Sequence, residues 1–215
     1  MSDSSVFEKV AAKRVVAVLV IDDEEQAVPV AEALLAGGVD IMELTLRTDA
    51  AMGALKRIRA SVPEMIAGIG TILTPDQAKE VHDADASFGV SPGLNEKVLE
   101  SAKQLGLAFA PGIVTPSDIE RALEFDLRVL KFFPAGPSGG LSYLNAIAAP
   151  YQHLGVQYLP LGGVNQANMG DYLANPNVAA IGGSWIATRE AIHAGDWKSI
   201  TANAKAAVAC AAAVV

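Results

Sequence analysis

Eight short apolar runs rich in β-branched residues recur along this chain of 215 residues at a nearly even interval. The runs occupy residues 15–21, 41–47, 66–72, 87–90, 108–114, 129–133, 157–161 and 178–181, so their starts are about 21 to 28 residues apart. This interval fits a strand, a loop and a helix, and its regularity indicates repeated strand–helix units. We therefore expect parallel strands with helices packed on them.

The segments between the runs begin like helices. Thr74-Pro75-Asp76-Gln77 combines an N-cap threonine, a proline at the first helical position and a glutamine at the third, and Thr115-Pro116-Ser117-Asp118 nearly repeats it. Residues 1–14 predict a further helix before the first run. The alanine-rich residues 197–213 predict another after the last run, apolar on nearly all sides and therefore covered.

Eight such units around one hydrophobic core predict a single (β/α)8 TIM barrel domain over residues 1–215, with an extra N-terminal helix and an Ala-rich C-terminal helix. The alternative is an open, doubly wound sheet. That fold normally has fewer strands and a Gly-x-Gly-x-x-Gly turn after the first one. Here Ile21 is followed by Asp22-Asp23-Glu24, which would repel a pyrophosphate, so the barrel is favoured.

Charge and composition narrow the classes of partner. A formal net charge of −8 disfavours nucleic acid, because phosphate backbones are bound by basic surfaces. The longest apolar stretches, residues 15–21 and 206–215, are too short to cross a bilayer, and no charged leader opens the chain, so we expect no membrane association. Cys210 is the single cysteine, which excludes an intrachain disulfide and indicates a cytoplasmic protein.

A lysine occupies the middle of the sixth run. Alternation along a strand places Val129, Lys131 and Phe133 on one face and Leu130 and Phe132 on the other, so both faces are expected to be buried. Lysine is almost never fully buried without a partner, because desolvation is costly or drives the amine to its neutral, nucleophilic form. The functional interpretation is a Schiff-base lysine, and the structural alternative is a lysine that extends from the strand end into water.

The second run also carries polar residues on one face. Alternation groups Glu43 and Arg47 with Thr45, while the apolar residues of the run point the other way. Working residues of barrels lie at the carboxyl ends of strands and in the loops that follow. Glu43 and Arg47 therefore form either an internal pair that braces the barrel, or an acid–base carboxylate beside an arginine that binds a carboxylate.

Small residues follow three further strands. Gly70-Thr71 offers a hydroxyl donor, and Gly162-Gly163 and Gly182-Gly183-Ser184 follow the seventh and eighth runs. Paired glycines before a helix leave backbone N–H groups free for an anion, and these two loops are the usual phosphate site of a barrel. His, Asp and Glu show no metal-site spacing in the sequence, and Lys131 can itself supply an electron sink, so we expect neither metal nor cofactor.

Five segments together resemble the bacterial 2-keto-3-deoxy-6-phosphogluconate (KDPG) aldolases, the class I enzymes of the Entner–Doudoroff pathway. The segments are Glu43-Leu44-Thr45-Leu46-Arg47, Gly70-Thr71, Ser91-Pro92-Gly93, Lys131-Phe132-Phe133-Pro134-Ala135 and Gly182-Gly183-Ser184. They occur in order over nearly the whole chain. The lysine motif joined to the Glu-x-Thr-x-Arg strand is specific to this family and its near relatives.

The resemblance implies that the chain cleaves 2-dehydro-3-deoxy-6-phosphogluconate to pyruvate and D-glyceraldehyde 3-phosphate, and that it forms a homotrimer. Lys131 would form the Schiff base with the C2 ketone, and Glu43 would accept and return protons. Arg47 and Thr71 would bind the pyruvate carboxylate. The residues implied for the phosphate are Gly162, Gly163, Gly183 and Ser184.

Two departures from the family pattern leave the preferred substrate open. Leu161 stands where many relatives have threonine, and Gly136 where many have glutamate. The nearest alternative substrate is 4-hydroxy-2-oxoglutarate, which has a carboxylate in place of the phosphate-bearing end. An alternative from another class is a barrel that binds a sugar phosphate without turning it over, with Lys131 only as a counter-ion.

Overall fold

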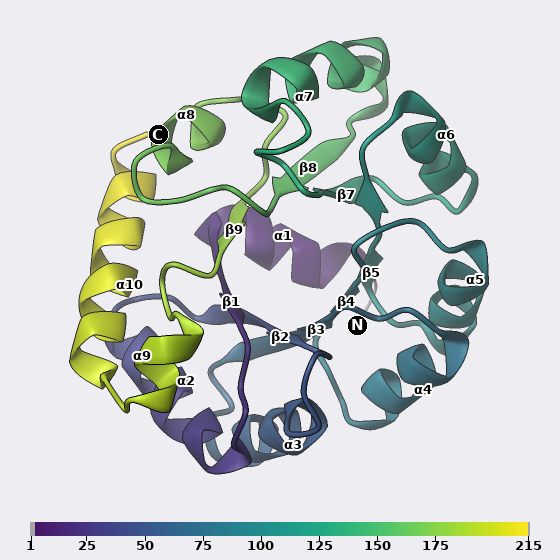
Figure 1. Cartoon of the computed structure of the whole chain (residues 1–215). Helices are drawn as coiled ribbons and strands as arrows, with labels where there is room; N and C mark the ends of the chain where they lie inside the picture. The colour runs from purple at the N-terminus through teal and green to yellow at the C-terminus, as the bar shows by residue number, and fades with distance from the viewer. Residues whose placement is uncertain (1–2, 215) are drawn as a thin grey trace.

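The computed structural model describes residues 3–214, and Figure 1 shows strands in the middle of the molecule with helices around them. The strands are β1 (Val15–Leu19), β2 (Ile41–Thr45), β3 (Ile66–Gly70), β4 (Gly89–Val90), β5 (Phe109–Ala110), β6 (Gly112–Ile113), β7 (Val129–Phe132), β8 (Gln157–Pro160) and β9 (Ile181–Gly183). The α-helices are α1 (Asp3–Lys13), α2 (Ala27–Ala36), α3 (Ala51–Ser61), α4 (Pro75–Asp83), α5 (Glu96–Leu105), α6 (Pro116–Glu124), α7 (Gly140–Ala148), α8 (Met169–Leu173), α9 (Arg189–His193) and α10 (Trp197–Ala212). Two 3-10 helices, η1 (Glu24–Gln26) and η2 (Ala149–Leu154), complete the described elements.

The strands are parallel and pair in two groups. Six form a sheet in the order β5-β4-β3-β2-β1-β9, and three form a second sheet in the order β6-β7-β8. With helices between successive strands, except between β5 and β6, the chain has an α/β fold built on a curled parallel sheet. The predicted alternation of strand and helix is therefore confirmed, and the open doubly wound arrangement is not observed.

The strands are shorter than the predicted runs, and two of the runs differ from the structure in more than length. The run 108–114 is divided into β5 and β6 at Pro111, which has no N–H to donate to a strand ladder. The run 178–181 overlaps β9 only at Ile181. Its first part turns to β8 instead, because Val178 bridges Tyr158 and the Ala179 N–H donates to the Tyr158 carbonyl over 3.0 Å.

The helix starts predicted from sequence are confirmed at α4 and α6. Thr74 accepts a hydrogen bond from the Gln77 N–H, and the Gln77 side chain accepts in return from the Thr74 N–H. Thr115 and Asp118 form the same reciprocal pair at the start of α6. Each pair satisfies backbone N–H donors that the first helical turn leaves without a partner. The caps therefore fix the residues at which α4 and α6 begin.

The core has an outer and an inner part. Met42 and Leu44 of β2 point outward into the large core under the helices, whereas Ile41 belongs to a smaller inner cluster. Helix α1 contributes Phe7 and Val10 to that inner cluster, where Phe7 lies with its ring centroid 6.0 Å from that of Phe88. The predicted N-terminal helix therefore packs against the interior of the sheet from the side at which the strands begin.

Helix α10 is buried on one face only, which corrects the expectation that it would be covered all round. Ala204 packs closely on Gly37 beside α2, where a β-carbon on Gly37 would lie 2.3 Å from the Ala204 Cβ, and the Thr201 hydroxyl donates to the Ala33 carbonyl over 2.9 Å. Ala202 and Ala206, on the other side, are exposed. Small side chains therefore allow close helix packing here without requiring burial on every side. Within residues 3–214, each helix is too short or too polar to span a bilayer.

We expect Tyr158→Phe to stabilise the fold by about 1 kcal/mol, which raises Tm by roughly 2 to 4 °C. Tyr158 is 1% exposed on β8, and its hydroxyl has no hydrogen-bond partner within the described part of the chain. Burial raises the pKa of this phenol to about 12. Differential scanning calorimetry measures the change. Tyr151→Phe is the matched control and should destabilise slightly, because its hydroxyl contacts Glu120 over 3.1 Å; a lower Tm for Tyr158→Phe would show that its hydroxyl is satisfied.

Candidate active site

A buried ion pair lies inside the curled sheet. The Lys131 Nζ atom on β7 is 2.9 Å from Oε1 and 3.3 Å from Oε2 of Glu43 on β2, and the two residues are only 5% and 2% exposed. Burying two charges costs more desolvation energy than their attraction usually returns, so an apolar pair would serve stability as well or better. The pair is therefore better explained by chemistry than by stability, and the extension of Lys131 into water is excluded.

Gly70, at the end of β3, gives the Glu43 carboxylate its space. A β-carbon on Gly70 would lie 1.8 Å from Glu43 Oε1 and 2.6 Å from Cδ, well inside contact distance. The backbone conformation of Gly70 is an ordinary extended one, so the need for glycine arises from this close approach and not from its dihedral angles. The carboxylate is thus held between strand β3 and the lysine.

We expect Gly70→Ala to lower kcat about 10²-fold, because the added methyl group displaces the Glu43 carboxylate from the Lys131 amine. Steady-state rates measure this change, and circular dichroism checks that the fold persists. Gly93→Ala is the matched control, since a β-carbon on Gly93 would meet no heavy atom within 4 Å. Equal rates for the two variants would contradict the role of Gly70 in positioning Glu43.

Two predicted carboxylate-binding residues, Arg47 and Thr71, are connected to this pair through the ends of β2 and β3. The Arg47 Nε atom donates to the Thr45 hydroxyl over 3.1 Å, and the Thr45 hydroxyl donates to the Leu19 carbonyl over 3.0 Å. Arg47 is thereby tied to Thr45, which lies two residues beyond Glu43 on β2, and the Arg47 side chain is exposed. Thr71 follows Gly70 directly and has a φ of 66°, a left-handed conformation that is rare for a β-branched residue and is found mostly at functional sites.

Apolar side chains surround the lysine. The Lys131 Nζ atom lies 5.3 Å from the centroid of the Phe133 ring, within the range of a cation–π contact. Leu161 is 6% exposed and lines, with Lys131 and Glu43, a small cavity of about 10 Å³ that Phe7 of α1 also lines. Sequence reasoning gave Phe133 no role, although the same alternation that selected Lys131 places Phe133 on its face.

The two glycine loops differ in why they need glycine. Gly162 and Gly163 have left-handed φ values of 80° and 92°, and neither donates its N–H to a protein acceptor among the residues described. In the other loop, a β-carbon on Gly182 would lie 2.6 Å from Leu161, and one on Gly183 would lie 1.4 Å from the Trp185 ring. Packing therefore explains why residues 182 and 183 are glycines. Ser184, which follows them in the second loop, is exposed.

Two contacts connect these loops to their neighbours. Gly136, after β7, donates its N–H to the Gly162 carbonyl over 2.8 Å, and its Cα lies 2.9 Å from where a β-carbon on Gly163 would be. Trp185 donates from its indole nitrogen to the Gln166 side chain over 3.4 Å. The departure at Gly136 thus coincides with a close backbone approach in which a larger side chain would have little room.

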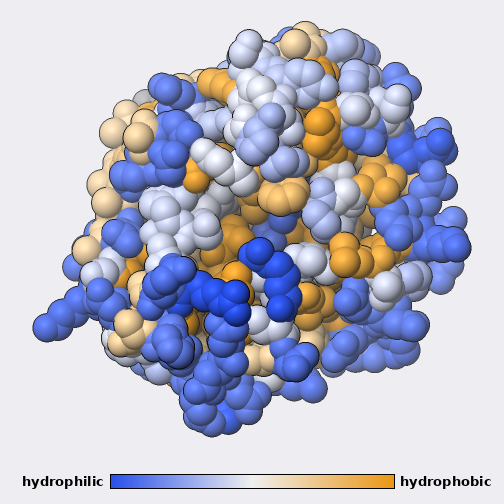
Figure 2. Space-filling model, viewed as in Figure 1, coloured by the Kyte–Doolittle hydropathy of each residue, from blue (hydrophilic) through white to orange (hydrophobic). Residues whose placement is uncertain are grey.

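An ion pair joins helix α9 to the loop after β1. Arg189 at the start of α9 donates two hydrogen bonds to Asp22, over 2.7 Å and 2.5 Å, in the loop after β1. These hydrogen bonds hold the pKa of Asp22 below its ordinary value. The acidic turn after β1 is therefore partly neutralised and is joined to α9. Figure 2 shows this face of the molecule, where hydrophobic residues gather around the middle among strongly hydrophilic ones.

The geometry defines a class of enzyme. A parallel α/β sheet that presents a buried primary amine next to a carboxylate, beside an arginine and a loop with free N–H groups, is the arrangement of a class I aldolase, a lyase that forms a Schiff base with a ketone. No group of three or more His, Cys, Asp or Glu side chains within residues 3–214 is placed to hold a metal ion.

The chain belongs to the KDPG and KHG aldolase family, whose model matches residues 6–203. The KHG/KDPG aldolase of Escherichia coli is 45% identical over 194 residues, which is 90% of each chain. The Legionella pneumophila KDPG aldolase, crystallised with pyruvate captured as a covalent carbinolamine intermediate, aligns with a TM-score of 0.90 and 38% identity over 96% of this chain and 98% of that one. The KDPG aldolase of Zymomonas mobilis with 3-phosphoglycerate aligns with a TM-score of 0.88 and 37% identity, over 97% of this chain and 98% of that one.

Proposed function

We propose that this protein is a class I aldolase that cleaves 2-dehydro-3-deoxy-6-phosphogluconate to pyruvate and D-glyceraldehyde 3-phosphate. The observation that carries the proposal is the buried contact of 2.9 Å between Lys131 and Glu43. Relatives that match over about nine tenths of the chain are named for this reaction, and the aligned Legionella structure holds pyruvate as a covalent carbinolamine. The alternative of a barrel that only binds a sugar phosphate leaves this buried pair unexplained.

Lys131 acts as the nucleophile. Its Nζ atom adds to the C2 ketone, and loss of water from the carbinolamine gives an iminium. Glu43 takes the proton of the C4 hydroxyl, the C3–C4 bond breaks, and its electron pair moves into the iminium to form an enamine while the aldehyde leaves. Glu43 then returns a proton to C3, and hydrolysis of the new iminium releases pyruvate and frees the lysine. The iminium is the electron sink, so the reaction requires no cofactor.

The polar residues around the pair bind the two ends of the substrate. Arg47 and Thr71 bind the carboxylate next to C2, supported by the Arg47–Thr45 hydrogen bond and the left-handed backbone of Thr71. The distal phosphate is bound by the loops after β8 and β9. The unpaired N–H groups support Gly162 and Gly163 in this role, and the exposure of Ser184 next to Gly183 supports the second loop.

The two sheets belong to a single (β/α)8 barrel domain with extra helices at its two ends. Two features support closure. Only Pro111 separates β5 from β6, and its carbonyl accepts the Lys131 N–H over 2.9 Å, which links the first sheet to β7. On the other side, the Tyr158–Val178 bridge leads from β8 into the segment that becomes β9. Such a barrel brings the ends of β2, β7 and β8 to one mouth.

The enzyme is a homotrimer in the cytoplasm. The resemblance to the aldolase family supports the trimer; the exposed Leu73 and Leu154 add nothing to it, because single apolar side chains are ordinary on a monomer surface. A phosphorylated substrate supports the location, because its charge makes crossing a membrane costly. Light scattering coupled to size-exclusion chromatography should give three times the chain mass; a monomer mass would contradict the trimer.

The substrate is tested by following pyruvate release from two keto acids. We expect kcat/KM to be roughly tenfold or more higher for 2-dehydro-3-deoxy-6-phosphogluconate than for 4-hydroxy-2-oxoglutarate, because only the former presents a phosphate to the glycine loops. Activity should persist in EDTA. Since Leu161 removes a hydroxyl from the site, a preference for 4-hydroxy-2-oxoglutarate is the competing outcome, and it would assign the chain to that reaction.

A further inference from the structure

A second cavity lies away from the ion pair, at the end where the strands begin. Its volume is about 670 Å³, within the range of small-molecule sites, and its walls include α1 and the first residues of β5, β7 and β8, namely Phe109, Val129 and Gln157. The carboxyl end of β8 leads to Gly162-Gly163, and the carboxyl end of β7 carries Lys131, so the proposed active site lies at the opposite end of these strands. The cavity is therefore separate from the proposed active site.

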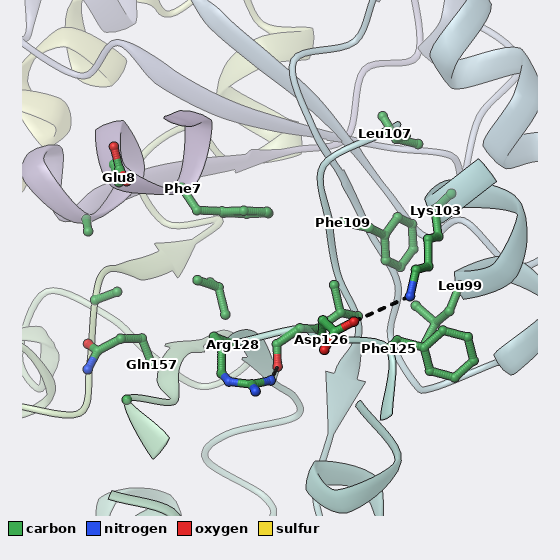
Figure 3. A pocket seen from close by; sticks show the side chains of 16 residues that line it. Phe7, Glu8, Leu99, Lys103, Leu107, Phe109, Phe125, Asp126, Arg128 and Gln157 are labelled. Atoms are coloured by element: carbon green, nitrogen blue, oxygen red, sulfur yellow. Dashed lines mark hydrogen bonds and ion pairs between the residues drawn. The ribbon is translucent and has the colours of Figure 1, made fainter. Parts of the chain in front are cut away.

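The cavity has an apolar floor. Phe7 reaches across from α1, and Phe109 and Phe125 face it from the other side, as Figure 3 shows. Phe7, Phe109, Leu99 and Leu107 are each less than 9% exposed, so this floor is built into the core and does not consist of surface side chains that happen to meet. A ligand in contact with it would bury an aromatic or branched aliphatic group.

One cation on the rim lacks an acidic partner. Arg128 is exposed and donates a hydrogen bond to the Leu127 carbonyl over 3.2 Å, but no carboxylate within residues 3–214 lies in ion-pair range of its guanidinium. The neighbouring Lys103 differs, because it pairs with Asp126 at 3.5 Å, the dashed contact in Figure 3. Glu8, which lines the cavity from α1, has no ion-pair partner among the described residues either, so the acidic and basic side chains of the lining balance. Arg128 is the basic side chain of the lining whose N–H donors remain free to pair with an anion.

We propose that this cavity is a second binding site, for a small carboxylate with an apolar aromatic or branched aliphatic body. The body occupies the floor formed by Phe7, Phe109 and Leu99, and the carboxylate pairs with Arg128 at the rim. The keto-acid phosphates of the active site do not fit this description, because their hydroxyl groups and phosphate would lose hydrogen bonds against an apolar floor.

Phe7 gives this site a contact with the catalytic region. The same side chain lines both the 670 Å³ cavity and the 10 Å³ cavity that Lys131 and Glu43 line. A ligand that packs on Phe7 fixes α1 against the inner cluster, so binding should raise Tm as well as occupy the site. This proposal does not depend on which keto acid the active site cleaves.

The test measures binding of two probes to the full-length protein, the fluorescent anilinonaphthalene sulfonate and its competitor 4-phenylbutyrate. Ala11→Trp blocks the cavity, because Ala11 is an exposed residue of α1 at its edge, and Ala12→Trp is the matched control on the same helix outside the lining. We expect saturable binding at one site per chain, displaced by 4-phenylbutyrate, at least tenfold weaker in Ala11→Trp and unchanged in Ala12→Trp.

The Arg128→Gln variant tests the contribution of the rim charge to binding while leaving the apolar floor unchanged. We expect roughly three- to tenfold weaker binding of both anions in this variant, and no change in Lys205→Gln, an exposed lysine on α10. Absence of saturable binding, or equal binding by Ala11→Trp and Ala12→Trp, would overturn the proposal. A change of oligomeric mass in Ala11→Trp alone would also overturn it, because the cavity would then be part of an interface between copies of the chain.

Discussion

Replacing Lys131 with methionine should lower kcat for aldol cleavage by about 10⁵-fold, the scale seen when a covalent nucleophile is removed. Methionine has a similar length and no amine, so neither carbinolamine nor iminium can form. The residual rate should come from substrate binding and from Glu43 alone. Pyruvate release in a coupled assay with lactate dehydrogenase measures the loss.

Stability must be separated from chemistry in this variant. Lys131→Met leaves Glu43 buried without its cation, a change that costs roughly 3 to 5 kcal/mol when the carboxylate stays charged. The double variant Lys131→Met with Glu43→Gln removes both charges and should recover most of that stability while remaining inactive. A Lys131→Met protein that is folded and retains more than about one hundredth of the activity would contradict covalent catalysis, since that loss lies far below the expected scale.

Glu43→Gln should lower kcat by about 10³-fold, within the range for loss of a general acid–base group. Glutamine keeps the shape of the side chain beside Gly70, but it cannot accept the C4 hydroxyl proton or return one to C3. The amine of Lys131 remains, so this variant should still form an iminium with pyruvate. Exchange of the pyruvate methyl protons for deuterium, followed by NMR, should slow with the same factor as cleavage.

The two roles are distinguished by comparing trapping with exchange. Borohydride should trap pyruvate on Lys131 in the Glu43→Gln protein, while proton exchange is nearly lost. Normal exchange in this variant would show that another group moves the proton, and would leave Glu43 only as the counter-ion of the lysine.

The repeat of apolar runs was sufficient to predict the order of the elements but not all their bounds. Local signals such as the Thr74 and Thr115 caps depend on four neighbouring residues, and these predictions were confirmed. The split at Pro111 and the turn of Val178 toward β8 depend on which strands become neighbours, which periodicity does not contain. The exposed face of α10 was missed because alanine-rich composition does not distinguish close packing from burial.

The site was predictable where strand alternation alone selects a side chain. Alternation predicted an inward polar face for Glu43 and a buried face for Lys131, but their direct contact joins residues 88 positions apart and follows only from the folded sheet. The reasons for Gly70 and Gly183 are contacts with Glu43 and Trp185, so their spacing could not reveal them. The position of Phe7 could not be predicted either, because nothing in the sequence of α1 indicates that its ring lines the same cavity as the ion pair.

The most direct test of the Schiff base is reduction with borohydride in the presence of pyruvate, followed by intact-protein and peptide mass spectrometry. The expected result is one reduced pyruvate adduct per chain, located on Lys131 and absent from Lys131→Met. An unmodified wild-type protein, or an adduct on another lysine, would contradict the assignment of Lys131 as the nucleophile.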